Sequence, residues 1–182
     1  ANVDANVIEI TADALTTGGR NTIIGYDALT AADGTESFNI AIGELAMASV
    51  NHDGADENIA IGFNALRGGS GEVDRCVAIG TYALDSTAHH DHTGSIAIGG
   101  NALEDLTSGA NNTAVGYQAG KDMTTAEDCT IIGYQAGLDA GSRSTLIGKN
   151  AGGSITSGGV NNVCVGKDAG DVIGAGDWNT II

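Results

Sequence analysis

The sequence predicts an all-β fold, a parallel β-solenoid of about ten short coils, with copies of the chain associated side by side as a homotrimer. Three observations predict this fold. A nine-residue motif recurs along the chain, and its copies are 15 to 19 residues apart. The motif is rich in Ile, Val and Thr, and the 182 residues include 29 glycines and no proline. Such recurrence at a short period is the sequence signature of a solenoid.

The motif begins with a small polar residue, followed by three mostly apolar residues and a glycine. Two variable residues, an alanine and a leucine or glycine complete it. We number these positions one to nine, so that Asn21 is position one of the first regular copy and Leu29 is its position nine. The turn glycines at position five are Gly25, Gly43, Gly62, Gly80, Gly99, Gly116, Gly133, Gly148 and Gly166. Because only the segments between copies vary in length, the motif is expected to stack and those segments to form loops.

The motif extends along the chain, so we expect a single repeat solenoid over residues 1–182. A degenerate first copy covers residues 7–15, where Thr11 replaces the glycine, and regular copies start at residue 21. The chain stops inside a further copy, over residues 179–182. It starts at Ala1 without an initiator methionine or a signal peptide, which is typical of a processed chain or a fragment.

The period and composition also predict the elements of each coil. About eighteen residues are too few for a pair of helices, and β-branched residues interrupted by glycine favour strands. We expect a short strand before the glycine, a turn at the glycine, a second short strand around the alanine, and a loop. Stacked copies would then form parallel ladders that rise about 4.8 Å per coil.

Side chains alternate between the two faces of a strand, so positions two and four share one face and positions one and three the other. Position four is always Ile or Val, and we predict that it forms the core inside the coil. These residues are Ile24, Ile42, Ile61, Ile79, Ile98, Val115, Ile132, Ile147 and Val165. Position three is also small or apolar, and a strand that is apolar on both faces is buried on both. We therefore predict that Ala41, Ala60, Ala78, Ala97 and Ala114 lie near the axis of the trimer.

The charge of the chain excludes several partners. It has 23 acidic and 7 basic residues, and its net charge is −16. Nucleic-acid binding needs a basic surface, so we expect no nucleic-acid partner. The apolar runs are only a few residues long, so we expect no membrane insertion.

Two kinds of segment could hold a metal ion. His90 and His92 alternate along the chain and could reach one transition metal. They lie in a variable segment, however, which favours an exposed loop whose histidines titrate freely. The acidic segments 53–57 and 126–128 offer oxygen ligands for Ca²⁺ but lack the spacing of an EF-hand. We expect no cofactor, with Ca²⁺ or a transition metal as the alternative.

The remaining chemically distinctive residues predict no enzyme. No Ser-His-Asp or Cys-His pairing emerges from the spacing. Cys76 and Cys129 occupy position one, three coils or about 14 Å apart, and a disulfide needs Cα atoms within about 7 Å. Together with Cys164 at position three, they are interpreted as small buried residues. The aromatic residues at position six are Tyr26, Phe63, Tyr117 and Tyr134. They favour packing between coils, with a stacking ladder for sugars as the alternative.

The repeats resemble those of two families. The segments Ile40-Ala41-Ile42-Gly43 and Ile59-Ala60-Ile61-Gly62, with 95–99, resemble the head repeats of trimeric autotransporter adhesins, which form β-rolls packed in threes. The Gly-Tyr-Gln-Ala-Gly segments 116–120 and 133–137 resemble repeats of phage tail-fibre and tail-spike shafts. The resemblance implies an extracellular protein, on a virion tail fibre or on a bacterial surface.

We therefore expect a structural and attachment segment of a trimeric phage tail fibre, which holds or forms a host-receptor-binding surface. The alternative is the head of a bacterial trimeric adhesin that binds a host glycan or matrix protein. A weaker alternative is an ice-binding solenoid, which needs a regular threonine array. The threonines at position two are Thr22, Thr113, Thr130, Thr145 and Thr180, and Ile or Val interrupts their row. We expect the variable segments 33–36, 52–57, 68–74 and 85–93 to lie outside every ladder and to carry binding surface.

Overall fold

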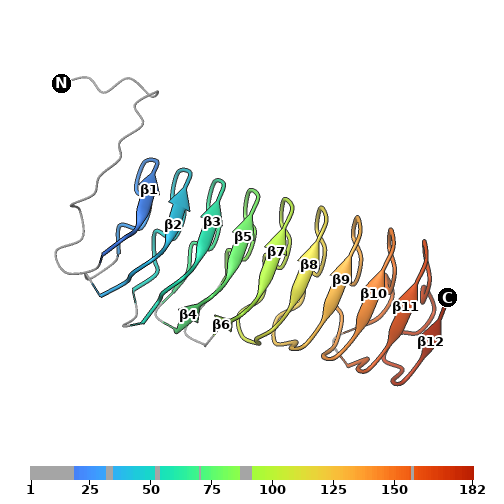
Figure 1. The fold of residues 1–182 in the computed structure, drawn as a ribbon. Helices are drawn as coiled ribbons and strands as arrows, with labels where there is room; N and C mark the ends of the chain where they lie inside the picture. The colour runs from blue at the N-terminus through green and yellow to red at the C-terminus, as the bar shows by residue number, and fades with distance from the viewer. Residues whose placement is uncertain (1–18, 32–34, 52–53, 70, 87–91, 157) are drawn as a thin grey trace.

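The computed structural model describes residues 19–31, 35–51, 54–69, 71–86, 92–156 and 158–182. Figure 1 shows an elongated solenoid whose coils stack one behind the next from the N-terminal to the C-terminal end. Its secondary structure is all-β, and the described residues contain no helix. The predicted parallel β-solenoid is confirmed for this part of the chain. The degenerate copy predicted over residues 7–15 lies outside the described residues.

One ten-stranded parallel sheet runs the length of the solenoid, with one strand from each coil. Its strands are β1 (Thr22–Ile24), β2 (Ile40–Ile42), β3 (Ile59–Ile61), β5 (Val77–Ile79), β7 (Ile96–Ile98), β8 (Thr113–Val115), β9 (Thr130–Ile132), β10 (Thr145–Ile147), β11 (Val163–Val165) and β12 (Thr180–Ile181). Equal motif positions lie opposite one another, so that Ile40 pairs with Ile59 and Ile59 with Val77. The spacing of the motif copies therefore sets the register of the sheet, because each motif position pairs with the same position of the next copy.

A second, two-stranded sheet corrects the prediction for the variable segments. Strands β4 (Val73–Asp74) and β6 (His92–Thr93) pair in parallel, in segments that were expected to lie outside every ladder. Val73 and His92 are buried, as is Glu36 in another of these segments. The longer coils thus fold part of their extra length into additional core, because an apolar side chain such as Val73 gains stability when it is buried.

The turn after each strand confirms the role predicted for the nine glycines. Each has φ between +132° and +139°, a region that favours glycine. A Cβ atom at Gly62 would lie 2.6 Å from the carbonyl oxygen of Gly80 in the next coil. The corresponding Cβ at Gly43 would approach Gly62 as closely, at 2.5 Å. Stacking therefore excludes every residue larger than glycine at this position.

The second strand predicted around the alanine does not form, and a series of turns replaces it. Positions seven and nine both have positive φ, as in Asn64 (54°) and Leu66 (47°). The Ala65 N–H donates to the carbonyl of Gly62, at 3.3 Å, and closes the first turn. The Leu66 N–H donates to the carbonyl of Ala83 in the next coil, at 2.9 Å. Two left-handed residues within three positions reverse the chain too sharply for a strand, yet the coils still stack through hydrogen bonds.

The burial of the main strands reverses the two predicted faces. The alanines at position three, Ala41, Ala60, Ala78, Ala97 and Ala114, are fully buried inside a single coil, so their placement at an axis between chains is wrong. The placement of position four inside the coil is wrong as well. Ile24, Ile42, Ile61, Ile79, Ile98, Val115, Ile132, Ile147 and Val165 point outward and are half-buried or exposed. Ile98 and Ile132, for example, retain 37% and 38% of their accessible surface.

The narrow interior of the coil explains this arrangement. Where position three is alanine, position nine is usually a buried Leu or Met, such as Leu66, Leu84 or Met47. In three coils with a larger residue at position three, Ile131, Leu146 and Cys164, position nine is glycine. A Cβ at Gly137 would lie 2.6 Å from Leu146, and a Cβ at Gly170 would contact the Cys164 sulfur. In these coils positions three and nine share one volume, because a close-packed interior leaves little room for two large side chains there. The first coil is an exception, since its Ile23 and Leu29 are both buried.

Position one carries a ladder of buried polar side chains that ties neighbouring coils together. The Asn39 amide donates to the carbonyl of Ala55 at 2.8 Å, and its oxygen accepts the backbone N–H of Asn58 at 2.9 Å. Asn58 repeats the pattern with Val73 and Cys76. Each asparagine thus satisfies a loop carbonyl of its own coil and a strand N–H of the next, which a buried amide must do to be stable.

The stacking of the glycines predicts the effect of Gly62→Ala. This substitution should lower the free energy of unfolding by about 3 kcal/mol or more, because it adds backbone strain and a steric clash with the next coil. Gly54 also has a positive φ (94°), but no atom lies within 4 Å of a Cβ built there. Gly54→Ala is therefore the matched control and should lose only about 1 kcal/mol. Urea unfolding checks both values, and equal losses would contradict the stacking constraint.

The orientation of the strands predicts opposite effects for neighbouring residues. Ala60→Leu should lower the free energy of unfolding by about 1–3 kcal/mol, because it overfills the coil. Measured on the single chain, at concentrations too low for association, Ile61→Thr should change it by no more than about 0.5 kcal/mol, because the side chain points outward. Denaturant titration of both variants would contradict the assigned faces if Ile61→Thr were the more damaging change.

Candidate functional site

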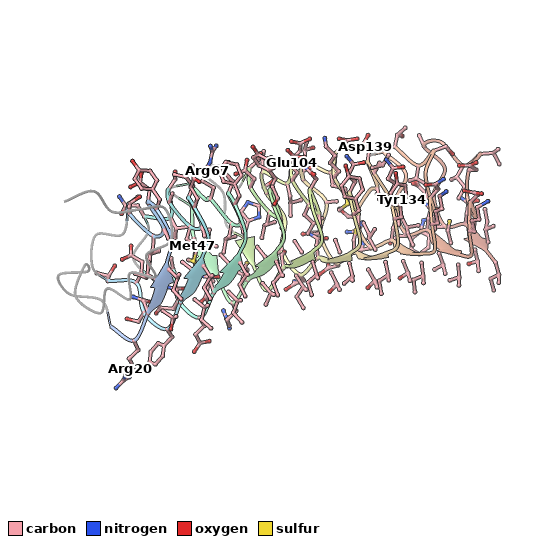
Figure 2. All side chains as sticks on the ribbon, turned by 90° about the horizontal axis from the view of Figure 1, so that it is seen from above. Arg20, Met47, Arg67, Glu104, Tyr134 and Asp139 are labelled. Carbon is pink, nitrogen blue, oxygen red and sulfur yellow. The ribbon has the colours of Figure 1, made fainter. Side chains whose placement is uncertain are left out.

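The outer face of the ten-stranded sheet is the most distinctive surface of the molecule. It consists of positions two and four, which we call the ladder face. Its residues are Thr22, Ile24, Ile40, Ile42, Ile59, Ile61, Val77, Ile79, Ile96, Ile98, Thr113, Val115, Thr130, Ile132, Thr145, Ile147, Val163, Val165 and Thr180. Figure 2 shows a row of short side chains projecting from the sheet away from the body of the coils. The sequence-based placement of position four inside the coil missed this surface.

The ladder face is long, flat and apolar. Ten strands about 4.8 Å apart give a length of roughly 43 Å, and two side-chain columns about 7 Å apart give an area on the order of 300 Å². Every side chain in it is Thr, Ile or Val, and in-register pairing keeps the columns straight. A contiguous apolar patch of this size is about the largest that a typical monomer exposes, and such patches are often functional.

Basic residues outnumber acidic residues next to the ladder face, although the chain as a whole is acidic. Two rows adjoin the strands of this face in sequence, the residue before position one and the residue at position six. These rows carry five of the seven basic residues, Arg20, Arg75, Arg143, Lys149 and Lys167, against three acidic ones, Glu44, Glu57 and Asp128. The other acidic residues that the structure describes lie at other positions of the coils, so like-charge repulsion between copies is smallest along this face.

The opposite side of the solenoid is polar. Figure 2 places Arg67, Glu104 and Asp139 there, across the coils from the ladder face. Lys121 forms ion pairs with Glu104 at 3.6 Å and with Asp105 at 3.5 Å. Burial raises the pKa of the Asp85 carboxyl, which the nearby Arg67 guanidinium partly offsets. Charged side chains thus give this side the character of a solvated surface.

Three of the four aromatic residues at position six contact side chains of neighbouring coils, whereas Tyr26 is largely exposed. The rings of Tyr117 and Tyr134 stack with centroids 5.6 Å apart and planes at 23°. The ammonium of Lys149 lies 5.7 Å from the centroid of Tyr134. Phe63 meets Tyr82 edge to face, at 5.3 Å. Contacts between coils thus hold the rings of Tyr117 and Tyr134, although about half of the surface of each remains exposed.

The two histidines proposed as metal ligands have different outcomes. His90 lies outside the described residues, so its pairing with His92 is not described. His92 is fully buried in β6, with Nε2 3.0 Å from the carbonyl oxygen of Thr107, so the expectation of an exposed loop histidine is wrong for it. Within the described ranges, no group of three His, Cys, Asp or Glu side chains is arranged to hold a metal ion.

The three cysteines are buried and free, as predicted. The Cys76 thiol donates to the carbonyl of His92, at 3.2 Å. Burial raises the pKa of Cys76 to about 11, and it raises the pKa values of Cys129 and Cys164 as well. Thiols with raised pKa values stay protonated near neutral pH, which makes them poor nucleophiles and metal ligands.

A comparison of the chain with protein-family models, curated proteins and solved structures gives no match. The resemblance to fibre and adhesin repeats therefore rests on the repeat residues themselves. Among the residues that the structure describes, no helix is long and apolar enough to cross a membrane.

The raised pKa of Cys76 predicts how stability depends on pH. The unfolded chain loses this thiol proton near pH 9, whereas the folded protein holds it to about pH 11. The resulting stabilisation is complete below pH 9 and is lost as the pH rises to about 11. Urea unfolding should show a fall of roughly 2 kcal/mol over this range from Cys76. The Cys76→Ala variant should show a smaller fall, and an identical fall in both proteins would contradict the assignment.

Proposed function

We propose that the chain is a structural and attachment segment of an extracellular homotrimeric fibre, of the kind that phage tails carry. The ladder face is the observation that supports this proposal. A single solenoid leaves this apolar surface in water, and association with other copies removes it from water at a gain of about 25 cal/mol per Å². The stacked coils supply length, and the polar side supplies the surface that faces solvent.

The occupant of the ladder face is a second copy of this chain. The face is self-complementary in chemistry, because Thr, Ile and Val side chains in straight columns pack against the same side chains of another copy. The face alone is smaller than the roughly 800 Å² per partner of specific interfaces, so side chains beside it must also contribute contacts. A dimer would also cover the ladder face. The resemblance to repeats of trimeric fibres and adhesins favours three copies about one axis.

Two alternatives follow from the same surface. The head of a bacterial trimeric adhesin would use the same association, and the segments around Ala41 and Ala60 favour it by resemblance. Ice binding would instead require a single solenoid with the face open to water. Thr113, Thr130 and Thr145 occupy adjacent strands in this face and favour that alternative, but isoleucine or valine accompanies each of them.

Charged residues placed in the ladder face should break the association. Sedimentation of the wild-type protein should give about three times the chain mass of 18.1 kDa. The double variant Ile61→Lys with Ile98→Lys should sediment as a single chain, because two lysines per copy cannot be buried without partners. Val172, an exposed valine outside this face, provides the matched control Val172→Lys, which should keep the wild-type mass.

Two results would contradict the proposal. One is a wild-type protein that sediments as a single chain at micromolar concentration. The other is a double variant with the same mass as the wild type. A single chain that also depressed the freezing point of water below its melting point would favour the ice-binding alternative.

A further inference from the structure

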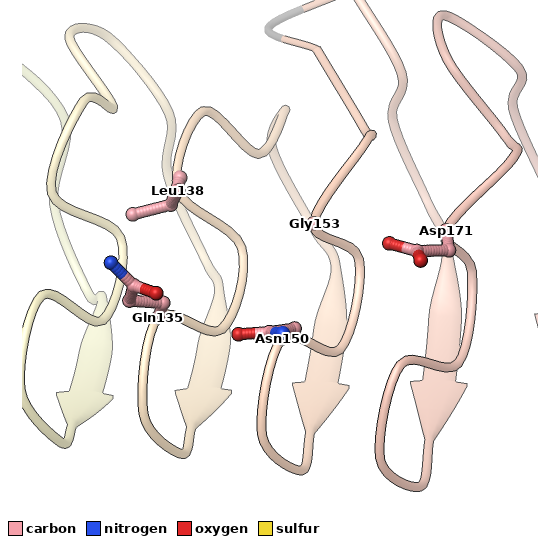
Figure 3. A pocket seen from close by; sticks show the side chains of 5 residues that line it. All are labelled: Gln135, Leu138, Asn150, Gly153 and Asp171. Carbon is pink, nitrogen blue, oxygen red and sulfur yellow. The ribbon is translucent and has the colours of Figure 1, made fainter.

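A hollow on the polar side of the solenoid interrupts a row of side chains. The residue after position nine, which we call position ten, carries a long side chain in the coils of Glu104, Lys121 and Leu138. In the next coil this residue is Gly153, which has none. The hollow at this point has a volume of about 240 Å³ and is lined by Gln135, Leu138, Asn150, Gly153 and Asp171. Figure 3 shows that three successive coils supply these residues.

The two amides of the hollow have orientations fixed by neighbours outside it. The Gln135 NH₂ donates to the Gln118 oxygen in the preceding coil, at 2.7 Å. The Asn150 NH₂ donates to the Asp168 carboxylate in the following coil, at 3.0 Å. The NH₂ groups therefore point away from each other. In Figure 3, the oxygens of Gln135 and Asn150 are turned toward one another.

The hollow consequently presents hydrogen-bond acceptors. The carboxylate of Asp171 is turned toward Gly153 and adds a third acceptor group to the two amide oxygens (Figure 3). Leu138 supplies an apolar wall beside them. Acceptors that line one hollow form hydrogen bonds with donors from a ligand or from water. The volume is several times the roughly 30 Å³ that one water molecule occupies, so the hollow has room for a ring-sized group.

We propose that this hollow is a subsite for one neutral sugar residue of a hydroxyl-rich glycan. Sugar hydroxyl groups supply the donors that Gln135, Asn150 and Asp171 require, and the C–H groups of the ring contact Leu138. The net charge of −16 and the carboxylate of Asp171 select against acidic sugars. A small number of polar groups that converge beside an apolar wall is typical of ligand sites.

Sugar binding at the hollow would supply the ligand class for the proposed attachment role. Only this link to attachment rests on the proposed function. Position ten lies on the side of the coils away from the ladder face, as Glu104 shows in Figure 2. Association through the ladder face therefore leaves the hollow open. Sugar binding itself does not require association, so the two proposals are tested separately.

The test uses the whole chain and two variants. One removes an acceptor from the hollow, and the other fills it. Asp171→Ala removes an acceptor at an exposed position. Gly153→Leu fills the gap with the residue that the preceding coil has at this place. A Cβ at Gly153 would lie 3.1 Å from the Asn150 carbonyl oxygen, so the backbone must adjust by a few tenths of an ångström. Asp27→Asn, at an exposed position seven, is the control that removes one charge elsewhere.

The ligands are a panel of neutral hexose and N-acetylhexosamine oligosaccharides, a sialylated oligosaccharide and CaCl₂. Saturation-transfer NMR and calorimetry should detect a neutral oligosaccharide and should detect neither the sialylated one nor Ca²⁺. Both hollow variants should weaken this binding at least tenfold, whereas Asp27→Asn should leave it unchanged.

Three results would overturn the proposal. They are no binding of any neutral saccharide, binding that Gly153→Leu leaves intact, and binding of Ca²⁺ in place of sugar that Asp171→Ala abolishes. Sedimentation of the hollow variants should match the wild type in every case. A changed mass would show that the variant alters the association of copies and not only sugar binding. The failures of the two proposals are therefore distinguishable.

Discussion

The close contact of successive glycine turns is the constraint on which the rest of the structure depends. A Cβ atom at Gly62 or Gly80 would lie 2.6 Å from the next glycine, so the backbones at this corner stack without side chains between them. This contact holds the strands of neighbouring coils in register, as in the pairing of Ile61 with Ile79. Register in turn aligns every other position along the axis, from the asparagine ladder inside to the isoleucine columns outside.

A tight coil leaves little interior volume, and this limit determines which side chains can point inward. Alanine at position three with leucine at position nine fills the space, and so does the reverse combination of Leu146 with Gly152. The bulky β-branched residues are therefore directed outward, where they form a continuous apolar surface. The geometry of a single coil thus generates the surface through which we propose that several chains associate, while the acidic residues on the other side favour solubility.

The sequence predicted the period, the turn glycines and the register well, because each is a property of spacing. It did not predict which face of the strand is inside, because both faces are apolar and alternation alone has no direction. The combination of Ile131 at position three with Gly137 at position nine indicates which face is inside, because a large inward residue there requires a small one opposite. Residues such as Leu66 gave no sign of their left-handed conformation, since only glycine and asparagine favour it strongly. The hollow at Gly153 depends on amide orientations that contacts between coils determine.

The most direct test of the ladder face measures the distance between equivalent residues of different copies. A nitroxide label at Thr22→Cys lies at the end of the face, and the native cysteines are buried and should not react. Pulsed dipolar spectroscopy should give one distance of roughly 10–20 Å, because faces of packed sheets are about 10 Å apart. A label at Val172→Cys, away from the face, should give a longer one. Absence of any dipolar coupling at Thr22, or a shorter distance at Val172, would contradict the account.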